Sequence, residues 1–287
     1  MSEQQGMAMV TDERARQWFL PAPTEEQPKV DVDTGVAHIA RVYNFWLGGK
    51  DNFAADREAA ELVISSYPTI LASVRAQREF LGRAVEYLVA EAGIRQFLDV
   101  GTGLPTASNT HEVAQLVAPQ ARVVYVDNDP IVLAHARALL ASNSQGATAY
   151  LDADLRNTTE ILAEAAKTLD FSQPVALMLI GVLHCIPDSD DPAGLVRRLL
   201  DAVPSGSYLV IAHPASDIHA TQIGTAANRL NQVMSDPVTM RSHAQVARFF
   251  DGLDLVDPGL VQLHRWRADP ADPDTELANY GGVARKP

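Results

Sequence analysis

The sequence predicts an α/β fold in which a mostly parallel sheet carries helices on both faces and follows an N-terminal helical cap. From residue 96 onward, short apolar runs alternate with amphipathic stretches, as expected of parallel strands joined by right-handed helical crossovers. Residues 34–94 instead show only helical periodicity. The first apolar run ends in a glycine-containing turn before a helix, which is typical of a Rossmann-like, nucleotide-binding sheet.

Length and charge limit the function classes. The 287 residues allow one large domain or two ordinary ones, at roughly 100 to 200 residues per domain. The net charge of −13 has the wrong sign for binding nucleic acid or an anionic membrane. The longest apolar run, Pro174 to Pro187, is shorter than the roughly 20 residues of a membrane span, and no secretory signal opens the chain. We expect a soluble, cytoplasmic protein without nucleic-acid or membrane partners.

The first 94 residues divide into an arm and a helical cap. Residues 1–33 are rich in Gln, Glu and Pro and have no apolar period, which predicts a mobile arm. Residues 34–94 carry apolar stripes at helical spacing and glycines that suit helix ends. The expected helices are 36–47, capped by Asp33 or Thr34 and ended by Gly48-Gly49, then 54–66 and 71–88.

Residues 95–287 are predicted to form the sheet domain. Its apolar runs have the length of strands, and the stretches between them have the length and spacing of helices. The expected strands are 96–100, 121–126, 148–151, 175–180, 207–212, 253–256, 260–263 and 279–284. The expected helices are 106–117, 130–141, 158–167, 192–203, 217–234 and 242–251.

Three successive expected strands end in residues suited to a nucleotide cofactor. The glycines of Asp99–Gly103 let the backbone approach a ligand, although Pro105 replaces the third glycine of the dinucleotide fingerprint. Asp127-Asn128 follows the second strand, where a carboxylate can accept both ribose hydroxyls. Asp154-Leu155 follows the third, where a carboxylate can accept a hydrogen bond from an adenine amino group. Alternatively, these carboxylates cap helices or lie in solvent.

These strand-end residues resemble those of the class I S-adenosylmethionine-dependent methyltransferases. More specifically, segments 40–53, 97–106 and 280–286 resemble the actinobacterial S-adenosyl methyltransferase family, and the resemblance spans nearly everything after residue 33. Small departures are Asn44 where Asp is common, Gln77 where Asn is common and Ser108 where Gly is common. The resemblance implies a seven-stranded Rossmann-like sheet, S-adenosylmethionine (SAM) as cofactor and S-adenosylhomocysteine (SAH) as product.

The resemblance also implies roles for the strand-end residues. Asp127 would hold the ribose, Asp154 the adenine amino group, and the glycine turn the methionine portion. Asp99, just before the glycines, suits a cofactor with a free amino group, which NAD lacks. The expected cofactor-binding residues are Asp99, Gly101, Thr102, Gly103, Asp127, Asn128, Asp154, Leu155 and Val182.

Histidines raise two further questions. His184 follows the fourth expected strand, where a transferred methyl group would be presented. With an ordinary pKa near 6.5 it could remove a proton from an acceptor hydroxyl, or it could instead shape the cofactor pocket. His213 and His219 lie six positions apart across a Pro, so they fit no helical zinc pair, and no metal site is predicted.

The segment Leu47 to Phe53 is the least ordinary one outside the expected sheet. Its glycines and its paired charges predict a lid over cofactor and substrate, although a helix end followed by a helix start would explain the same residues. Two arginines three positions apart on the next helix could bind a carboxylate or form a solvated basic face. The expected substrate and lid residues are Tyr43, Asn44, Lys50, Asp51, Asn52, Arg75 and Arg78.

We therefore predict a SAM-dependent methyltransferase that acts on a small-molecule acceptor, with the acceptor and the oligomeric state left open. Two alternatives remain at this point. An NAD-dependent oxidoreductase shares the order of strand, glycines, helix and acid, but the chain has no Tyr-x-x-x-Lys pair of the short-chain type. A non-catalytic protein that binds SAM or SAH would show the same residues.

Overall fold

The computed structural model describes residues 33–106, 108–139, 145–269 and 275–287. The predicted N-terminal arm lies outside these residues, apart from Asp33. The strands are β1 Gln96–Val100, β2 Arg122–Asp127, β3 Ala147–Asp152, β4 Ala176–Ile180, β5 Tyr208–Pro214, β6 Asp254–Leu255, β7 Val261–Gln262 and β8 Asn279–Arg285. The helices are α1 Ile39–Trp46, α2 Ala54–Ser66, α3 Ile70–Ala90, α4 Thr110–Val117, α5 Pro130–Leu139, α6 Thr158–Ala165, α7 Pro192–Asp201, α8 Ala220–Leu230 and α9 His243–Ala247. Short 3₁₀ turns are η2 Leu183–Cys185, η3 Asp188–Asp190, η4 Arg248–Phe250 and η5 Leu263–Arg265.

The strands form one mixed sheet in the order β3-β2-β1-β4-β5-β8-β6, with β7 also paired to β8. Strands β1 to β5 are parallel, and β8 is antiparallel to β5. This confirms the predicted mostly parallel α/β fold. The described sheet has eight strands, as many as the apolar runs predicted, whereas the family resemblance implied seven. The extra strand arises because β6 and β7, two residues each, pair with different parts of β8.

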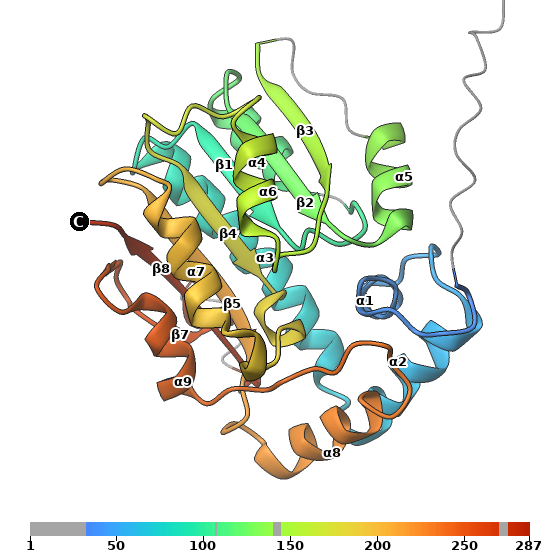
Figure 1. The fold of residues 1–287 in the computed structure, drawn as a ribbon. Coiled ribbons are helices and arrows are strands. Elements are labelled where there is room, and N and C mark those ends of the chain that lie inside the picture. The colour runs from blue at the N-terminus through green and yellow to red at the C-terminus, as the bar shows by residue number, and fades with distance from the viewer. Residues whose placement is uncertain (1–32, 107, 140–144, 270–274) are drawn as a thin grey trace, which may run out of the picture. The chain divides into compact units, whose positions relative to one another are not determined.

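Helices cover both faces of the sheet, as predicted (Figure 1). Side chains of α3 and α4 pack with one set of strand residues, including Phe97 and Met178, whereas α6 and α7 pack with the alternating set, including Leu98 and Leu177. Because both faces are buried, β1 and β4 consist entirely of buried residues. Helix α3, expected within the cap, is therefore a helix of the sheet layer.

Three helices gather near the carboxyl ends of the parallel strands (Figure 1). Helices α1 and α2 come from the predicted cap segment, and α8, which follows β5, packs against α2. The division of the chain at residue 94 remains a prediction. The described residues from Asp33 onward belong to one compact unit.

The start of α1 differs from the prediction. His38, rather than Asp33 or Thr34, occupies the N-cap position, and the Asp33 carboxylate instead accepts a hydrogen bond from Gly35 N (2.9 Å). The preceding backbone does not continue the helix because Ala37 forms a β-bridge with Met234. The predicted helix end is confirmed at Gly48, whose φ of 80° is favourable for glycine.

Candidate functional site

A cavity lies at the carboxyl ends of β1 to β4, and we call it the strand-end cavity. The neighbours of β1 are β2 and β4, so successive crossovers run in opposite directions and leave a crevice where such sheets bind ligands. Residues at and after the end of each of these strands line it, and the start of α1, α3 and the segment after α8 contribute further wall. All the sequence-predicted cofactor residues line this cavity, namely Asp99, Gly101, Thr102, Gly103, Asp127, Asn128, Asp154, Leu155 and Val182.

The glycine turn after β1 requires glycine for two different reasons. Gly101 has φ of 76°, and a Cβ there would lie 2.4 Å from the Val182 side chain. Gly103 has φ of 65°, but a Cβ there would meet no protein atom within 4 Å. Gly101 therefore allows tight packing against the loop after β4, whereas Gly103 keeps the backbone beside the cavity open to a ligand.

Asp99 is a buried carboxyl beside this turn. Thr110 Oγ1 donates a 2.6 Å hydrogen bond to Asp99 Oδ2. Burial raises the pKa of Asp99 to about 6, although the Thr110 hydrogen bond and the charge of Arg78 oppose this shift. Arg78 also lines the strand-end cavity, so groups of both charge signs lie next to the glycine turn.

Asp127, at the end of β2, is buried and orders the neighbouring loops. Its Oδ2 accepts a hydrogen bond from Gly103 N (2.8 Å), and its Oδ1 accepts one from Asp129 N (2.9 Å). Burial raises the pKa of Asp127, and these two N–H groups limit the rise. The carboxylate is thus fixed in position by the backbone of two strand-end loops.

Asp154, after β3, is more exposed and already paired. Its Oδ2 accepts hydrogen bonds from Arg156 Nη1 (2.8 Å) and Asn128 Nδ2 (3.3 Å). Arg156 also pairs with Asp190 through a 2.6 Å contact. Asp154 is therefore the member of the carboxylate set whose interactions are most shared with solvent and neighbouring side chains.

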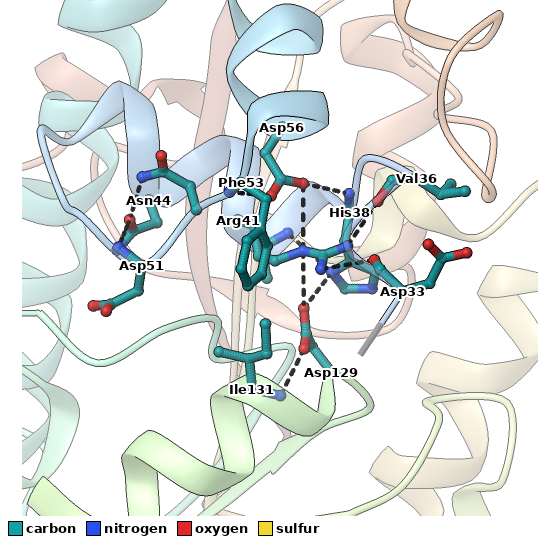
Figure 2. A network of polar contacts seen from close by, with 12 residues as sticks. Asp33, Val36, His38, Arg41, Asn44, Asp51, Phe53, Asp56, Asp129 and Ile131 are labelled. Carbon is teal, nitrogen blue, oxygen red and sulfur yellow. Dashed lines mark hydrogen bonds and ion pairs between the residues drawn. The ribbon is translucent and has the colours of Figure 1, made fainter. Parts of the chain in front are cut away.

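A buried polar network connects α1 and α2 to the loop that follows β2 (Figure 2). His38 Nδ1 lies 2.8 Å from Asp129 Oδ2, and His38 N donates to Asp56 Oδ1 (2.9 Å). Arg41 Nε lies 3.3 Å from Asp56 Oδ1 and 3.8 Å from Asp129 Oδ2. Asp129 Oδ1 accepts from Ile131 N (2.8 Å), at the start of α5. The network thus attaches the cap helices to the loop that carries Asp127.

His38 is the member of this network that lines the strand-end cavity. Its Nδ1 also lies 3.4 Å from Ala40 N, but the 2.8 Å contact with a carboxylate requires Nδ1 to donate, so we assign the hydrogen bond to Asp129. Burial opposes protonation of His38, but the hydrogen bond and charge of Asp129 outweigh it and raise its pKa. Sequence patterns did not reveal His38 or Arg41, because their partners are far away in the chain.

A second cavity adjoins the first, and we call it the apolar cavity. Residues of α1, α2, α3 and α8 line it, together with residues after β4, at the end of β5, after α8 and around the start of β8. Ile39, Tyr43, Gln77 and Gly181 line both cavities, so the two share a wall. Tyr43 OH donates to Val74 O (3.1 Å) and accepts from Gln77 Nε2 (3.2 Å).

His184 lines the apolar cavity, and the buried guanidinium of Arg241 holds the backbone on either side of it. Arg241 pairs with Asp188 (2.7 Å) and donates to two backbone carbonyls in and just after η2. His213 Nδ1 lies 2.8 Å from Pro214 O and must donate to it, so its Nε2 accepts from Arg241 Nη1 (3.0 Å). Burial, followed by the charge of Arg241, lowers the pKa of His184 to about 4.

The predicted substrate and lid residues separate in the structure. Tyr43 and Arg78 line the cavities, as just described. Asn44 is buried, and its Oδ1 accepts from Asp51 N (3.1 Å) and Asn52 Nδ2 (2.9 Å), which ties down the segment after α1 (Figure 2). The side chains outside both cavities are Asn44, Lys50, Asp51, Asn52 and Arg75. The lid remains a prediction.

The described residues contain neither a candidate metal site nor a helix that could cross a membrane. Among residues 33–106, 108–139, 145–269 and 275–287, no group of three or more His, Cys, Asp or Glu side chains is placed to hold a metal ion. None of the helices in those ranges has the length and apolar character needed to cross a membrane.

The comparison with known families agrees with this geometry. A model of the S-adenosyl methyltransferase family matches residues 25–287, which include both cavities. The chain belongs to the S-adenosyl methyltransferase family. The sequence-based resemblance and the predicted enzyme class, a SAM-dependent methyltransferase, are thereby confirmed.

Solved structures extend the similarity of this S-adenosyl methyltransferase. A DUF574 family protein from Streptomyces avermitilis is 47% identical, with a TM-score of 0.86 over 89% of this chain and 99% of that chain. A candidate methyltransferase from Thermobifida fusca is 39% identical, with a TM-score of 0.81 over 92% and 99%. The plantazolicin methyltransferase BpumL, in complex with a triazolic desmethylPZN analog and SAH, shares the fold at 10% identity and a TM-score of 0.51 over 86% and 95%. No protein with curated annotation matches the chain significantly.

Proposed function

We propose that this methyltransferase binds SAM in the strand-end cavity and methylates a small molecule held in the apolar cavity. The observation that carries the proposal is the position of Asp99, Asp127 and Asp154 at successive strand ends around one cavity, which adjoins a second. Membership of the S-adenosyl methyltransferase family supports the cofactor. SAM supplies an electrophilic methyl group on a sulfonium, so the chain has chiefly to align the acceptor and exclude water.

The residues of the strand-end cavity fit SAM chemically. Asp99 and Arg78 offer opposite charges, which suit the amino and carboxylate groups of a methionine portion. Asp127 is fixed by two backbone N–H groups and would use its remaining lone pairs to accept the ribose hydroxyls. Asp154 would accept a hydrogen bond from the adenine amino group, and Gly103 leaves space beside the backbone.

His184 would contact the acceptor in the apolar cavity. Its pKa of about 4 leaves the imidazole neutral at pH 7, with one nitrogen able to accept a hydrogen bond. A group with so low a pKa is a weak base. We therefore expect His184 to orient an acceptor hydroxyl or amine, and to take its proton only as the new bond forms.

Equilibrium binding tests the cofactor. Calorimetric titration of the purified chain with SAH, SAM and NAD should give binding of SAH and SAM and none of NAD. A chain that binds NAD but not SAH would contradict the proposal and favour the oxidoreductase alternative. Incubation with labelled SAM and small-molecule extracts should yield a labelled product, whereas SAH binding without any transfer would favour the non-catalytic alternative.

A further inference from the structure

The apolar cavity has the position of an acceptor site. An occupant would lie next to the strand-end cavity because the two share Ile39, Tyr43, Gln77 and Gly181. The inference below rests on the proposed function, since it names the class of molecule that this site accepts.

The lining of the apolar cavity excludes a charged occupant. Among the described residues, no Lys, Arg, Asp or Glu lines it. His184 is neutral at pH 7, and the guanidinium of Arg241 is already used by Asp188, His213 and backbone carbonyls. A carboxylate or ammonium group placed here would lose its hydration without gaining a counter-ion, which is strongly unfavourable.

The aromatic residues of the lining offer ring surface rather than polar atoms. Trp46 Nε1 donates to Ala60 O (3.3 Å), away from the cavity. Tyr67 OH lies 3.3 Å from Ser73 Oγ and accepts from Ala278 N (3.0 Å). Since these polar atoms already have partners, Trp46 and Tyr67 present apolar faces to an occupant, and ring contacts are favourable there.

His184 contributes an imidazole to this wall, which also contains the amide side chains of Gln77 and Asn279. Neither of its ring nitrogens has a hydrogen-bond partner among the described residues, and Nδ1 is shielded from solvent. Its ring contact is with His213, at 6.2 Å between centroids. A buried polar group without a partner is uncommon in folded proteins, so an occupant that carries a hydroxyl or N–H group would complete the site.

We propose that the acceptor is a neutral, mostly apolar, ring-containing molecule whose single hydroxyl or N–H group meets His184 beside the shared wall. This assignment follows from three independent features of the apolar cavity. The lining has no charged side chain, its aromatic residues have their polar atoms paired elsewhere, and its unpartnered histidine lies on the wall.

Matched probes that differ by one charge test this assignment. With the full chain and saturating SAH, calorimetry compares 2-naphthol with 6-hydroxy-2-naphthoate, and phenol with 4-hydroxybenzoate. We expect the neutral member of at least one pair to bind at least 30-fold tighter than its carboxylate. Tighter binding of the carboxylates, or no binding of either neutral probe, would overturn the assignment.

Substitutions in α8 locate the binding. Ala227→Phe fills the apolar cavity and should abolish binding of the neutral probe while SAH still binds. Asn228→Phe adds a ring at the neighbouring exposed position and should change neither. If Ala227→Phe lowers the melting temperature strongly, Ala226→Leu is a smaller addition to the same wall.

The two proposals fail in distinguishable ways. If the wild-type chain does not bind SAH, the proposed cofactor is wrong. The neutral and charged probes can then still be compared in the absence of SAH. If SAH binds but the neutral probes bind equally well to wild type, Ala227→Phe and Ala226→Leu, the proposed acceptor site alone is wrong.

Discussion

The strand-end cavity and the apolar cavity share a wall but differ in chemistry. The strand-end cavity contains carboxyl groups at the ends of consecutive strands, and backbone N–H groups hold that of Asp127 in place. The described lining of the apolar cavity comes from four helices and from strand ends and loops, and it includes no Lys, Arg, Asp or Glu. A nucleotide cofactor needs fixed polar partners, and these follow from strand topology. The acceptor site can vary with the helices around it, because the sheet does not determine it.

Replacing Asp127, the proposed ribose ligand, should produce the largest effect on SAH binding in the strand-end cavity. Asp127→Ala should weaken SAH binding by about 10- to 100-fold, since a charged hydrogen bond contributes roughly 1.5 to 3 kcal/mol. Asp152→Ala is a matched control, because Asp152 is the exposed register partner of Asp127 on β3 and lies outside the cavity. Calorimetry should show weakening in the first variant alone. Equal affinity for both would remove Asp127 from the site.

Lowering the pH should weaken SAH binding in the strand-end cavity but not neutral-probe binding in the apolar cavity. Because the pKa of Asp99 is about 6 in the free protein and a cofactor ammonium favours the carboxylate, SAH binding should weaken about tenfold from pH 7 to pH 5. Asp99→Asn should remove this dependence. Neutral-probe binding should stay constant over the same range, since the pKa values of His184 and His213 are about 4 and about 3. SAH affinity that does not change with pH would contradict the assignment of Asp99.

The stability of the free protein should change with pH in the opposite direction. The pKa of Asp99 rises from 3.8 to about 6 on folding, so its contribution to the free energy of unfolding is present below about pH 4. That contribution is lost as pH rises through about 6. Thermal melts of wild type and Asp99→Asn between pH 5 and pH 7 measure the difference.

The cap network should affect the strand-end cavity indirectly. His38→Ala removes the partner of Asp129, whose N–H orders Asp127, and should weaken SAH binding by about three- to tenfold. The control is His135→Ala, because His135 is also partly exposed but contacts Asp51 outside the cavity, at 3.6 Å. The raised pKa of His38 means that its pairing stabilises the fold below about pH 6.5 and is lost as pH rises through the higher value. Identical SAH affinities in the two variants would refute this coupling.

Asp154→Asn should weaken SAH binding less than Asp127→Ala, by about threefold, because the amide keeps an acceptor oxygen. Asp190→Asn changes the other carboxylate paired with Arg156 and should leave the SAH affinity unchanged. If Asp154→Asn has the larger effect of the two cavity variants, Asp154 meets a group other than the adenine amino group.

The smallest effect on binding is expected in the segment after α1. Lys50 and Asp51 are exposed and lie outside both cavities, so replacing both with Ala should change SAH affinity by less than about twofold. The lid prediction adds that methyl transfer falls strongly and that protease cleavage within residues 47–53 slows when SAH is present. Unchanged transfer and unchanged cleavage would identify the segment as a structural joint.

The strand-end cavity was largely predictable from sequence because strand topology and local turns define it. Asp99, Asp127 and Asp154 each follow an apolar run, and parallel strands bring their carboxyl ends together at one edge. The eight apolar runs also predicted the eight strands, but they did not indicate that β6 and β7 occupy successive stretches beside the same partner strand.

The apolar cavity was not predictable because its wall depends on packing between distant segments. Tyr67 lies in it beside residues of α8, more than 150 positions later, and no local pattern indicates that contact. The same holds for the pairing of His38 with Asp129 across 91 positions. The position of His184 after the fourth expected strand indicated this residue from sequence. The lack of charged residues around it could be recognised only from the structure.

We propose that the strand-end cavity holds the cofactor and the apolar cavity holds the acceptor. A crystal structure of the full chain grown with SAH and 2-naphthol would locate both molecules at once. We expect SAH in the strand-end cavity with its ribose at the Asp127 carboxylate, and the naphthol ring in the apolar cavity with its hydroxyl at His184. SAH with its ribose away from Asp127, or extending through the apolar cavity, would contradict it.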